Sequence, residues 1–245
     1  MSVFSMEDEC SQWERLAGEF VEAGQFYQAA NQYKQAADCY LERVLDMAKK
    51  SAEYYHMHAE SSLEKGNHRA ASTSYFEAAT QYRQTGDLST ALTLYENAAK
   101  EALLENMTET AAQSYLWAAY ACHKLDNAEY FLTCAKNVGD LYKQAGDKAL
   151  DAGKAERAVI DFSLAAMGFA TIDRTKDAQE LIKTAKRIID KTRWDWLGTL
   201  LSFSEALTNN KLDEASGLLK KFKEEDTIKE VMSACLDILE EKQKK

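Results

Sequence analysis

Alanine and aromatic residues recur in a fixed pattern along this chain, G-x4-A-x3-[YF]-x2-A-A. The offsets of 5, 9, 12 and 13 from the glycine step by four, three and one, so these positions share one stripe of an α-helix. Four copies begin at Gly24, Gly66, Gly86 and Gly153, and a fifth begins with Asn106. Each copy therefore predicts a turn followed by one amphipathic helix.

The spacing of the copies predicts how the helices are joined. Gly66, Gly86 and Asn106 are 20 residues apart, which is one helix and its turn. Glycine or asparagine ends the preceding helix because both tolerate the left-handed conformation. Alanine lets neighbouring backbones approach, and the aromatic ring fills the gap between them. A hairpin takes about 40 residues, so the pattern predicts a right-handed α-solenoid of antiparallel helical hairpins with a helical C-terminal cap.

About twelve helices are predicted. The alanine and aromatic pattern fades after Arg174, so we expect a twisted repeat sheet over 1–174 and a C-terminal helical bundle or cap, continuous with it, over 175–245. Copy spacing breaks between Asn106 and Gly153, and we expect a short or interrupted helix in DLYKQAGDKALDAGKAER. The predicted helices are 6–23, 26–45, 48–65, 68–85, 88–104, 107–124, 127–145, 154–171, 175–191, 194–208, 212–223 and 227–243.

Composition supports helix almost throughout. None of the 245 residues is proline, where a usual frequency of roughly 5% would give about 12. The formal net charge of −10 disfavours nucleic acid, which binds clustered lysine and arginine. Charge is uneven, with −6 over residues 1–60 and +1 over residues 181–245. The C-terminal quarter is therefore the electropositive end.

The sequence indicates neither a targeting segment nor a disulfide framework. No stretch approaches the roughly 18 to 20 apolar residues of a membrane span, and the first ten residues lack the features of a signal peptide. The five cysteines are odd in number and show no C-x-x-C spacing, so neither disulfides nor a zinc site is expected. We expect a cytoplasmic protein whose cysteines are mostly small core residues.

Catalytic chemistry is not predicted either. The segment from Gly146 to Ala155 resembles a phosphate loop, but its glycines are separated by six residues instead of four and no strand precedes it. His56 and His58 are two residues apart on a helix and point to different sides. Cys122 and His123 are sequence neighbours, which rarely gives the geometry of a nucleophile and its base. We therefore expect no catalytic residues, no cofactor and no metal.

Three stretches resemble the soluble NSF attachment protein (SNAP) family: AGQFYQAANQYKQAADCY, KGNHRAASTSYFEAATQYRQTGDLSTALTLYENAAK and FKEEDTIKEVMSACLDILEE. These proteins are divergent relatives of tetratricopeptide arrays. The resemblance implies an adaptor without catalytic activity, whose concave basic face grips the coiled-coil bundle of SNARE proteins. Its C-terminal region would recruit a hexameric, NSF-like AAA+ ATPase that disassembles the bundle in membrane fusion and vesicle transport.

The resemblance also implies contact residues, and three groups are predicted. Basic residues on the helices are the candidates for the grip on an acidic bundle: Arg83, Lys124, Lys143, Lys154, Arg157, Lys183, Lys186 and Arg187. On the last helix, Lys229, Glu230 and Asp237 are candidates to face the ATPase. Before the first helix, Val3, Phe4 and Met6 are candidates for weak peripheral membrane contact.

The chain departs from the family in three respects. It is about one helical hairpin shorter, Gln113 stands where a basic contact residue would align, and the acidic, leucine-bearing tail is replaced by Glu240 to Lys245. A second hypothesis is therefore a generic tetratricopeptide-like scaffold that binds a peptide or a subunit in its concave groove. The first hypothesis requires a basic concave face, whereas an apolar or mixed groove satisfies the second.

Overall fold

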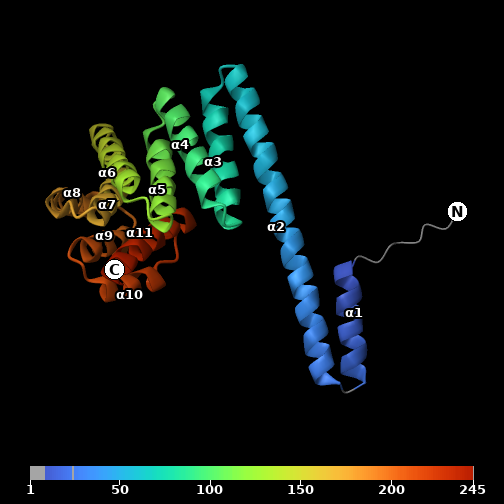
Figure 1. Ribbon diagram of the computed structural model, residues 1–245. Helices are drawn as coiled ribbons and strands as arrows, with labels where there is room; N and C mark the ends of the chain where they lie inside the picture. Colours follow the sequence, from blue (N-terminus) through green and yellow to red (C-terminus); the bar gives the residue numbers. More distant parts are fainter. Residues whose placement is uncertain (1–8, 24, 245) are drawn as a thin grey trace.

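The computed structural model describes residues 9–23 and 25–244, and all regular elements in these ranges are helices. Eleven α-helices and one 3-10 helix follow one another, which confirms the predicted all-α solenoid (Figure 1). The elements are α1 (Glu9–Glu22), α2 (Phe26–Glu64), α3 (His68–Gln84), α4 (Leu88–Leu104), α5 (Thr108–Lys124), α6 (Ala128–Asp151), α7 (Ala155–Thr171), α8 (Thr175–Ile188), η1 (Ile189–Lys191), α9 (Trp196–Thr208), α10 (Leu212–Lys221) and α11 (Asp226–Lys244).

Consecutive helices pack against one another, so the array follows the order of the chain. Helices α3 to α6 stand side by side, and α7 to α11 form a compact group at the far end (Figure 1). Helix α1 lies against the first half of α2, and this hairpin projects away from the other helices (Figure 1). The division into a repeat sheet over 1–174 and a C-terminal bundle or cap over 175–245 stays a prediction.

Seven of the turns between the described helices share one geometry. Each of the seven contains a residue with positive φ, and a backbone bond closes the turn across five residues, as from Met107 N to Ala102 O at 2.9 Å. This confirms the turns predicted at Gly66, Gly86, Asn106 and Gly153, whereas Gly24 lies outside the described residues. The positive-φ residues are Gly66, Gly86, Asn106, Asp126, Gly153, Asp173 and Asn210.

The alanine and aromatic stripe forms the core in most copies. In α4, for example, Ala91, Tyr95, Ala98 and Ala99 are all fully buried. The first copy is different, because Ala29 and Ala36 are buried but Tyr33 is 48% exposed. Tyr33 lies on the half of α2 that packs against α1 and extends beyond α3, so α3 does not cover it (Figure 1).

Two predicted helix boundaries were wrong. Helix α2 is one helix of 39 residues, not two helices with a break near residue 46. The stretch around Leu45-Asp46-Met47 has no glycine, asparagine or proline, and nothing there ends a helix. Helix α6 runs without interruption for 24 residues through Gly146, so its greater length explains the longer spacing to Gly153.

The apolar core has two clusters that meet in the middle of the array. One is built mainly from α2 to α6, and the other from α5 to α11. Helix α11 belongs to both, because Ala234 and Ile238 join the first cluster while Met232 and Leu236 join the second. The C-terminal helix is therefore a core element that ties the cap to the repeats.

Candidate functional site

The basic residues predicted to grip a partner occupy several separate places. Lys154 and Arg157 lie at the edge of the array formed by the α4–α5 and α6–α7 turns. Arg83 and Lys124 lie in the last turns of α3 and α5, at the opposite edge. The structure thus brings together pairs of these residues, and their joint role in one concave face stays a prediction.

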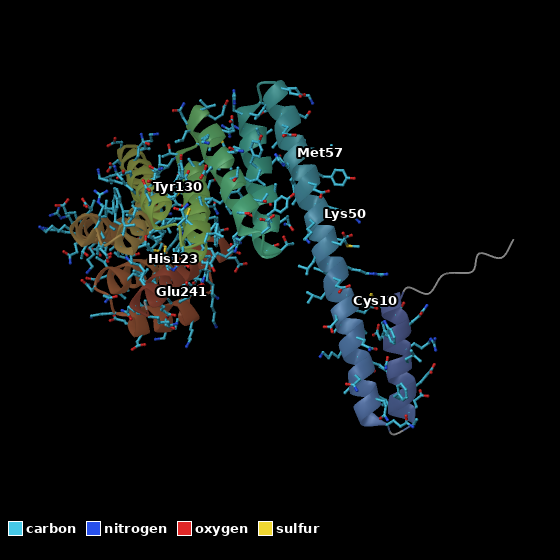
Figure 2. All side chains as sticks on the ribbon, viewed as in Figure 1. Cys10, Lys50, Met57, His123, Tyr130 and Glu241 are labelled. Atoms are coloured by element: carbon cyan, nitrogen blue, oxygen red, sulfur yellow. A yellow bond between two sulfur atoms is a disulfide. The ribbon has the colours of Figure 1, made fainter. Side chains whose placement is uncertain are left out.

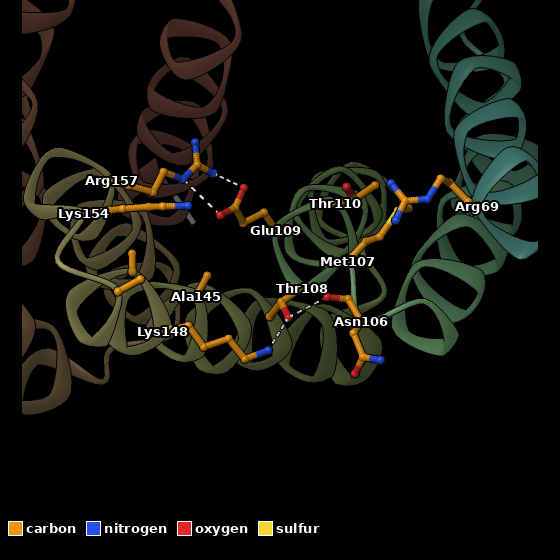
Figure 3. Close-up of a pocket in the computed structure, with 12 residues that line it drawn as sticks. Arg69, Asn106, Met107, Thr108, Glu109, Thr110, Ala145, Lys148, Lys154 and Arg157 are labelled. Carbon is orange, nitrogen blue, oxygen red and sulfur yellow. Dashed lines mark hydrogen bonds and ion pairs between the residues drawn. The ribbon is translucent and has the colours of Figure 1, made fainter.

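The edge with Lys154 and Arg157 encloses a hollow of about 380 Å³ (Figure 3). Lys154 and Arg157 reach from the start of α7 towards the first turn of α5, and Lys148 reaches it from α6 (Figure 3). Lys148 Nζ donates a hydrogen bond to Thr108 Oγ1 at 3.1 Å. Arg69 joins the lining from α3, on the far side of Met107 (Figure 3). We call this site the basic hollow, and its 12 lining residues are Arg69, Asn106, Met107, Thr108, Glu109, Thr110, Ala145, Lys148, Ala149, Ala152, Lys154 and Arg157.

Arg157 is fixed between two carboxylates. Its Nε lies 3.0 Å from Glu109 Oε1 and 3.2 Å from Asp161 Oδ2, and its Nη2 also pairs with Glu109. Asp161 is fully buried, and burial raises the pKa of its carboxyl to about 7, although Arg157 opposes this shift. The other oxygen of Asp161 has no hydrogen-bond partner in the described part of the protein. Arg157 is therefore held rigidly at the hollow's wall.

Arg83 and Lys124 make contacts within the fold. The guanidinium of Arg83 stacks over Trp117 at 4.0 Å, and its Nε donates to Tyr95 Oη at 3.2 Å. Lys124 pairs with Glu241 of α11, which raises the pKa of Lys124 and lowers that of Glu241. These two cations thus already make intramolecular contacts.

The remaining predicted cations lie on α6 and α8. Lys143 pairs with Asp147 at 3.7 Å on α6. Lys186 pairs with Glu205 of α9 at 2.6 Å and lines a small hollow together with Lys183. Arg187, one position further, is exposed on α8. The predicted cluster of three on α8 therefore contains one residue that a carboxylate already neutralises.

The predicted ATPase-facing residues lie on a helix that is mostly buried. Glu230 of α11 is exposed, and Lys229 is partly exposed. Asp237 is half-buried, and burial raises the pKa of its carboxyl while Lys124 opposes that shift. The last turn is bound to the array, because Glu241 Oε2 lies 3.1 Å from His123 Nε2 (Figure 2) and Lys242 Nζ lies 2.8 Å from Asp173 Oδ2. The predicted membrane residues Val3, Phe4 and Met6 lie outside the described residues.

Sequence reasoning missed an exposed apolar stripe on α2. Tyr33, Tyr40, Met47 and Tyr54 are spaced by seven residues, and Met47 and Tyr54 are 68% and 69% exposed. Seven-residue spacing on a helix aligns side chains along one side, as in coiled coils. Further along α2, Met57 is also exposed, on the flank that faces away from α3 (Figure 2). The seven-residue spacing is present in the sequence. It was missed because the prediction divided α2 into two helices.

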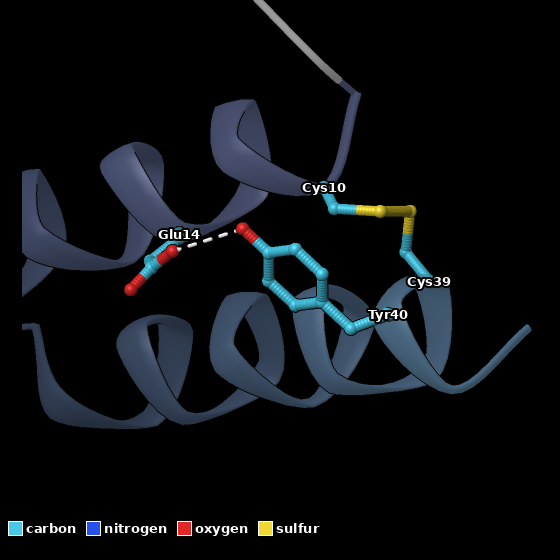
Figure 4. Close-up of a disulfide and its surroundings, with 4 residues drawn as sticks. All are labelled: Cys10, Glu14, Cys39 and Tyr40. Atoms are coloured by element: carbon cyan, nitrogen blue, oxygen red, sulfur yellow. Dashed lines mark hydrogen bonds between the residues drawn. A yellow bond between two sulfur atoms is a disulfide. The ribbon is translucent and has the colours of Figure 1, made fainter. Parts of the chain in front are cut away.

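Sequence reasoning also missed a disulfide, and the prediction of no disulfides was wrong. Cys10 of α1 and Cys39 of α2 are bonded, with their Cα atoms 5.5 Å apart, beside a hydrogen bond from Tyr40 Oη to Glu14 Oε2 (Figure 4). The pairing follows from the hairpin: Cys10 lies 14 residues before Gly24, and Cys39 lies 15 after it. The other three cysteines, Cys122, Cys134 and Cys235, are buried, as predicted for small core residues.

The residues that the structure describes form neither a metal centre nor a membrane span. In the described part of the chain, no group of three or more His, Cys, Asp or Glu side chains lies together as metal ligands would. None of the described helices combines the length and the apolarity that a bilayer crossing requires. The surface features that remain are charged edges, small hollows and the stripe on α2.

A helical-hairpin array with charged edges defines a class of repeat protein that acts through its surfaces. The model of one family, the soluble NSF attachment proteins (SNAP), matches residues 5–130. That match covers just over half of the chain, so the protein belongs to the SNAP family. This is a family of adaptors without catalytic activity. No curated protein matches the sequence closely enough to count as a relative.

Proposed function

We propose that this protein is an adaptor that binds a SNARE-like coiled-coil bundle and recruits an NSF-like AAA+ ATPase to disassemble it. The observation that carries the proposal is the SNAP family match over residues 5–130. The helical-hairpin array supports it, because such arrays present extended surfaces to elongated partners. Its place would be the cytoplasm, with peripheral contact to membranes.

The bundle-binding step is tested with the purified chain and an assembled SNARE complex. We expect binding that weakens with rising salt, because exposed charges are screened over about 10 Å at 0.1 M. Reversal of Lys183, Lys186 and Arg187 to glutamate should reduce the affinity further. Lys220, Lys221 and Lys223 serve as a matched triple reversal elsewhere in the electropositive C-terminal quarter. Equal losses in both triple variants would remove the α8 cluster from the binding site.

Recruitment of the ATPase is best tested without removing α11. Deletion of residues 227–245 would confound binding with unfolding, because it would remove eight buried core side chains: Ile228, Val231, Met232, Ala234, Cys235, Leu236, Ile238 and Leu239. The double variant Lys229→Glu with Glu230→Lys keeps the net charge and changes the exposed flank alone. We expect this variant to lose capture of an AAA+ ATPase from the organism's own lysate while its melting temperature is kept. Unchanged capture would remove these residues from the docking surface.

A second candidate function is a scaffold that holds a peptide in a groove. It is supported by a hollow of about 340 Å³ between α5, α7 and α11, whose lining includes Gln113, Trp194 and Val231. This lining mixes apolar and polar groups, so it is better suited to binding a peptide than to binding an acidic bundle. Substitution Trp194→Ala should then abolish partner capture. Capture of an ATPase that is insensitive to Trp194→Ala would favour the adaptor.

A further inference from the structure

The basic hollow has a local charge opposite to that of the whole chain. Its lining holds four cationic side chains and one carboxylate, which gives a local formal charge of +3, whereas the chain carries −10. The carboxylate is Glu109, and the cations are Arg69, Lys148, Lys154 and Arg157. A concentration of positive charge in an acidic protein requires an explanation beyond ordinary solubility.

Three of the four cations have no carboxylate partner in the described part of the chain. Among the described residues, no acidic side chain lies within ion-pair distance of Arg69, Lys148 or Lys154. Elsewhere on α6, Lys143 does have a carboxylate partner one turn away, Asp147. The repulsion between unpaired cations that line the same small space disfavours the empty hollow and favours an anion in it.

Backbone donors add to the positive character of the hollow. Helices α5 and α7 both begin at its edge, after Met107 and Lys154, and neither first turn is capped by a side chain. By contrast, Asn67, Asp87 and Asn127 cap α3, α4 and α6 by accepting first-turn N–H bonds. The uncapped N–H groups of α5 and α7 point out of the helix ends and are available to an anion.

We propose that the basic hollow binds a compact phosphorylated anion, such as an inositol polyphosphate or the headgroup of a phosphoinositide. Its volume of about 380 Å³ lies in the usual range of small-molecule sites, and its four cationic side chains favour an anionic ligand. Phosphate groups offer three acceptor oxygens each, which suits lysines and an arginine fork that approach from two helices. The proposal goes beyond the adaptor function, and either can fail without the other.

Glu109 opposes this binding. It is the carboxylate of the lining, and it holds both Nε and Nη2 of Arg157. Asp161 holds Arg157 from the protein side, so Arg157 stays in place when Glu109 is neutral. Loss of the Glu109 charge should therefore free the outer face of Arg157 for a phosphate. This gives the site a variant with higher affinity as well as one with lower affinity.

The first test is calorimetric titration of the full chain with inositol hexakisphosphate at physiological salt. We expect saturable binding, and the double variant Lys148→Gln with Lys154→Gln should bind at least about tenfold more weakly, because charge-assisted bonds are lost. The matched control is Lys100→Gln with Lys136→Gln, two exposed lysines outside the hollow with the same change in net charge. Equal loss in both double variants, or no binding by the wild type, overturns the proposal.

The second test removes a negative charge from the hollow, so binding should become stronger instead of weaker. Glu109→Gln should raise the affinity several-fold, about the effect of removing one adjacent like charge from a partly screened site. Glu129→Gln is the matched control, because each glutamate is the second residue of its helix and Glu129 is exposed outside the hollow. An equal rise in both variants would show a response to net charge alone and would overturn a defined site.

The third test separates the two sources of the phosphorylated group. Phosphatidylcholine vesicles with and without phosphatidylinositol bisphosphate are sedimented with wild type and with the Lys148/Lys154 variant. Sedimentation that needs the phosphoinositide and both lysines supports a lipid headgroup, and binding of soluble inositol hexakisphosphate alone supports a soluble ligand. If an acidic helical bundle displaces neither probe, the hollow is separate from the bundle site. If neither probe binds and the bundle needs both lysines, the proposal is overturned in favour of that partner.

Discussion

Glycines in α6 and α7 allow these two helices to approach closely. A Cβ atom on Gly139 would lie 2.3 Å from the ring of Phe169, and one on Gly168 would lie 3.1 Å from the backbone nitrogen of Gly139. The first distance is far shorter than an ordinary contact, and the second is shorter by a few tenths of an ångström and involves backbone. The helix that carries Lys148 and the one that carries Arg157 thus take their relative position from these glycines.

The first prediction concerns this crossing. Gly139→Ala should lower the free energy of unfolding by about 1 to 3 kcal/mol, because the added methyl group overpacks the interface. The control is Gly198→Ala in α9, where nothing lies within 4 Å of the new atom. That control should be neutral or stabilising by up to about 1 kcal/mol, from helix propensity. Urea unfolding measures both, and equal effects would show that α6 and α7 are not closely packed at Gly139.

The second prediction concerns the buried carboxyl of Asp161. Burial raises its pKa to about 7, with Glu109 raising and Arg157 lowering it, whereas the unfolded value is near 3.8. Between these values the folded protein binds the extra proton, so the free energy of unfolding falls as pH rises through this window. Asp161→Asn should remove this loss, which is of the order of a few kcal/mol.

Urea unfolding of wild type and Asp161→Asn at pH 5 and pH 8 measures the effect. The difference between the two proteins should shift in favour of the asparagine variant at pH 8. Groups with the opposite sign, such as Glu241 whose pKa is lowered by Lys124, act equally in both proteins and cancel. Parallel stability curves would show that Asp161 is already ionised at pH 5.

At the scale of the elements, the turns set the length of each helix. Gly66, Gly86, Asn106 and Asp126 are 20 residues apart and all have positive φ. A residue with a Cβ atom pays a steric cost in this conformation, whereas glycine does not. The turn after α5 uses Asp126, which no glycine pattern predicts, although the helix boundaries there were placed correctly from the apolar stripe.

The third prediction exchanges residue types at these turns. Asn106→Gly should stabilise the protein by up to about 1 kcal/mol, because glycine adopts positive φ without strain. Gly86→Ala should destabilise it by about 1 to 2 kcal/mol, although the space around it is open. Thermal melting measures both. A loss of stability in Asn106→Gly would mean that the asparagine side chain contributes more than its backbone strain costs.

Much of the fold was predictable from residue pattern, because short-range rules decide it. The stripe around Tyr95 identified the core face, and glycine marked the ends of α2, α3 and α6. The continuity of α2 was not predicted, since its repeat copy suggested a helix of ordinary length. Of the four cations of the basic hollow, Lys154 and Arg157 were among the predicted basic residues. Lys148 and Arg69 were not, because they lie on other helices and the sequence pattern does not show how these helices pack together.

The fourth prediction concerns the hairpin of α1 and α2. The Cys10–Cys39 bond closes a segment with a separation of 29 residues, which restricts the unfolded hairpin by about 3 to 4 kcal/mol. Cys39→Ser should therefore raise hydrogen exchange in α1 while α3 to α6 stay protected, because α1 packs on the half of α2 remote from them. A reductant should act likewise on wild type and leave Cys39→Ser unchanged. Loss of protection throughout would show that the hairpin supports the whole array.

At the scale of the whole molecule, α11 connects helices that are far apart in the array. A solenoid held by contacts between neighbours alone unfolds in parts, since each repeat touches only the next. Here α11 returns to α5 and α7, and its buried face joins both apolar clusters. Its last turn is bound to α5 through Glu241 and to the α7–α8 turn through Lys242. The C-terminal residues therefore couple the cap to the repeats.

The fifth prediction tests this coupling with Ile238→Ala. Ile238 is 1% exposed and belongs to the cluster of α2 to α6, so its truncation should cost about 2 to 5 kcal/mol. Because α11 spans both clusters, hydrogen exchange should rise in α4 and α5 as well as in α7 and α9. The control Leu104→Ala removes an exposed leucine at the end of α4 and should leave both regions protected. Faster exchange confined to α11 would contradict the coupling. It would show that α11 detaches from the array by itself. The flank of α11 around Glu230 would then be free to move when a partner binds.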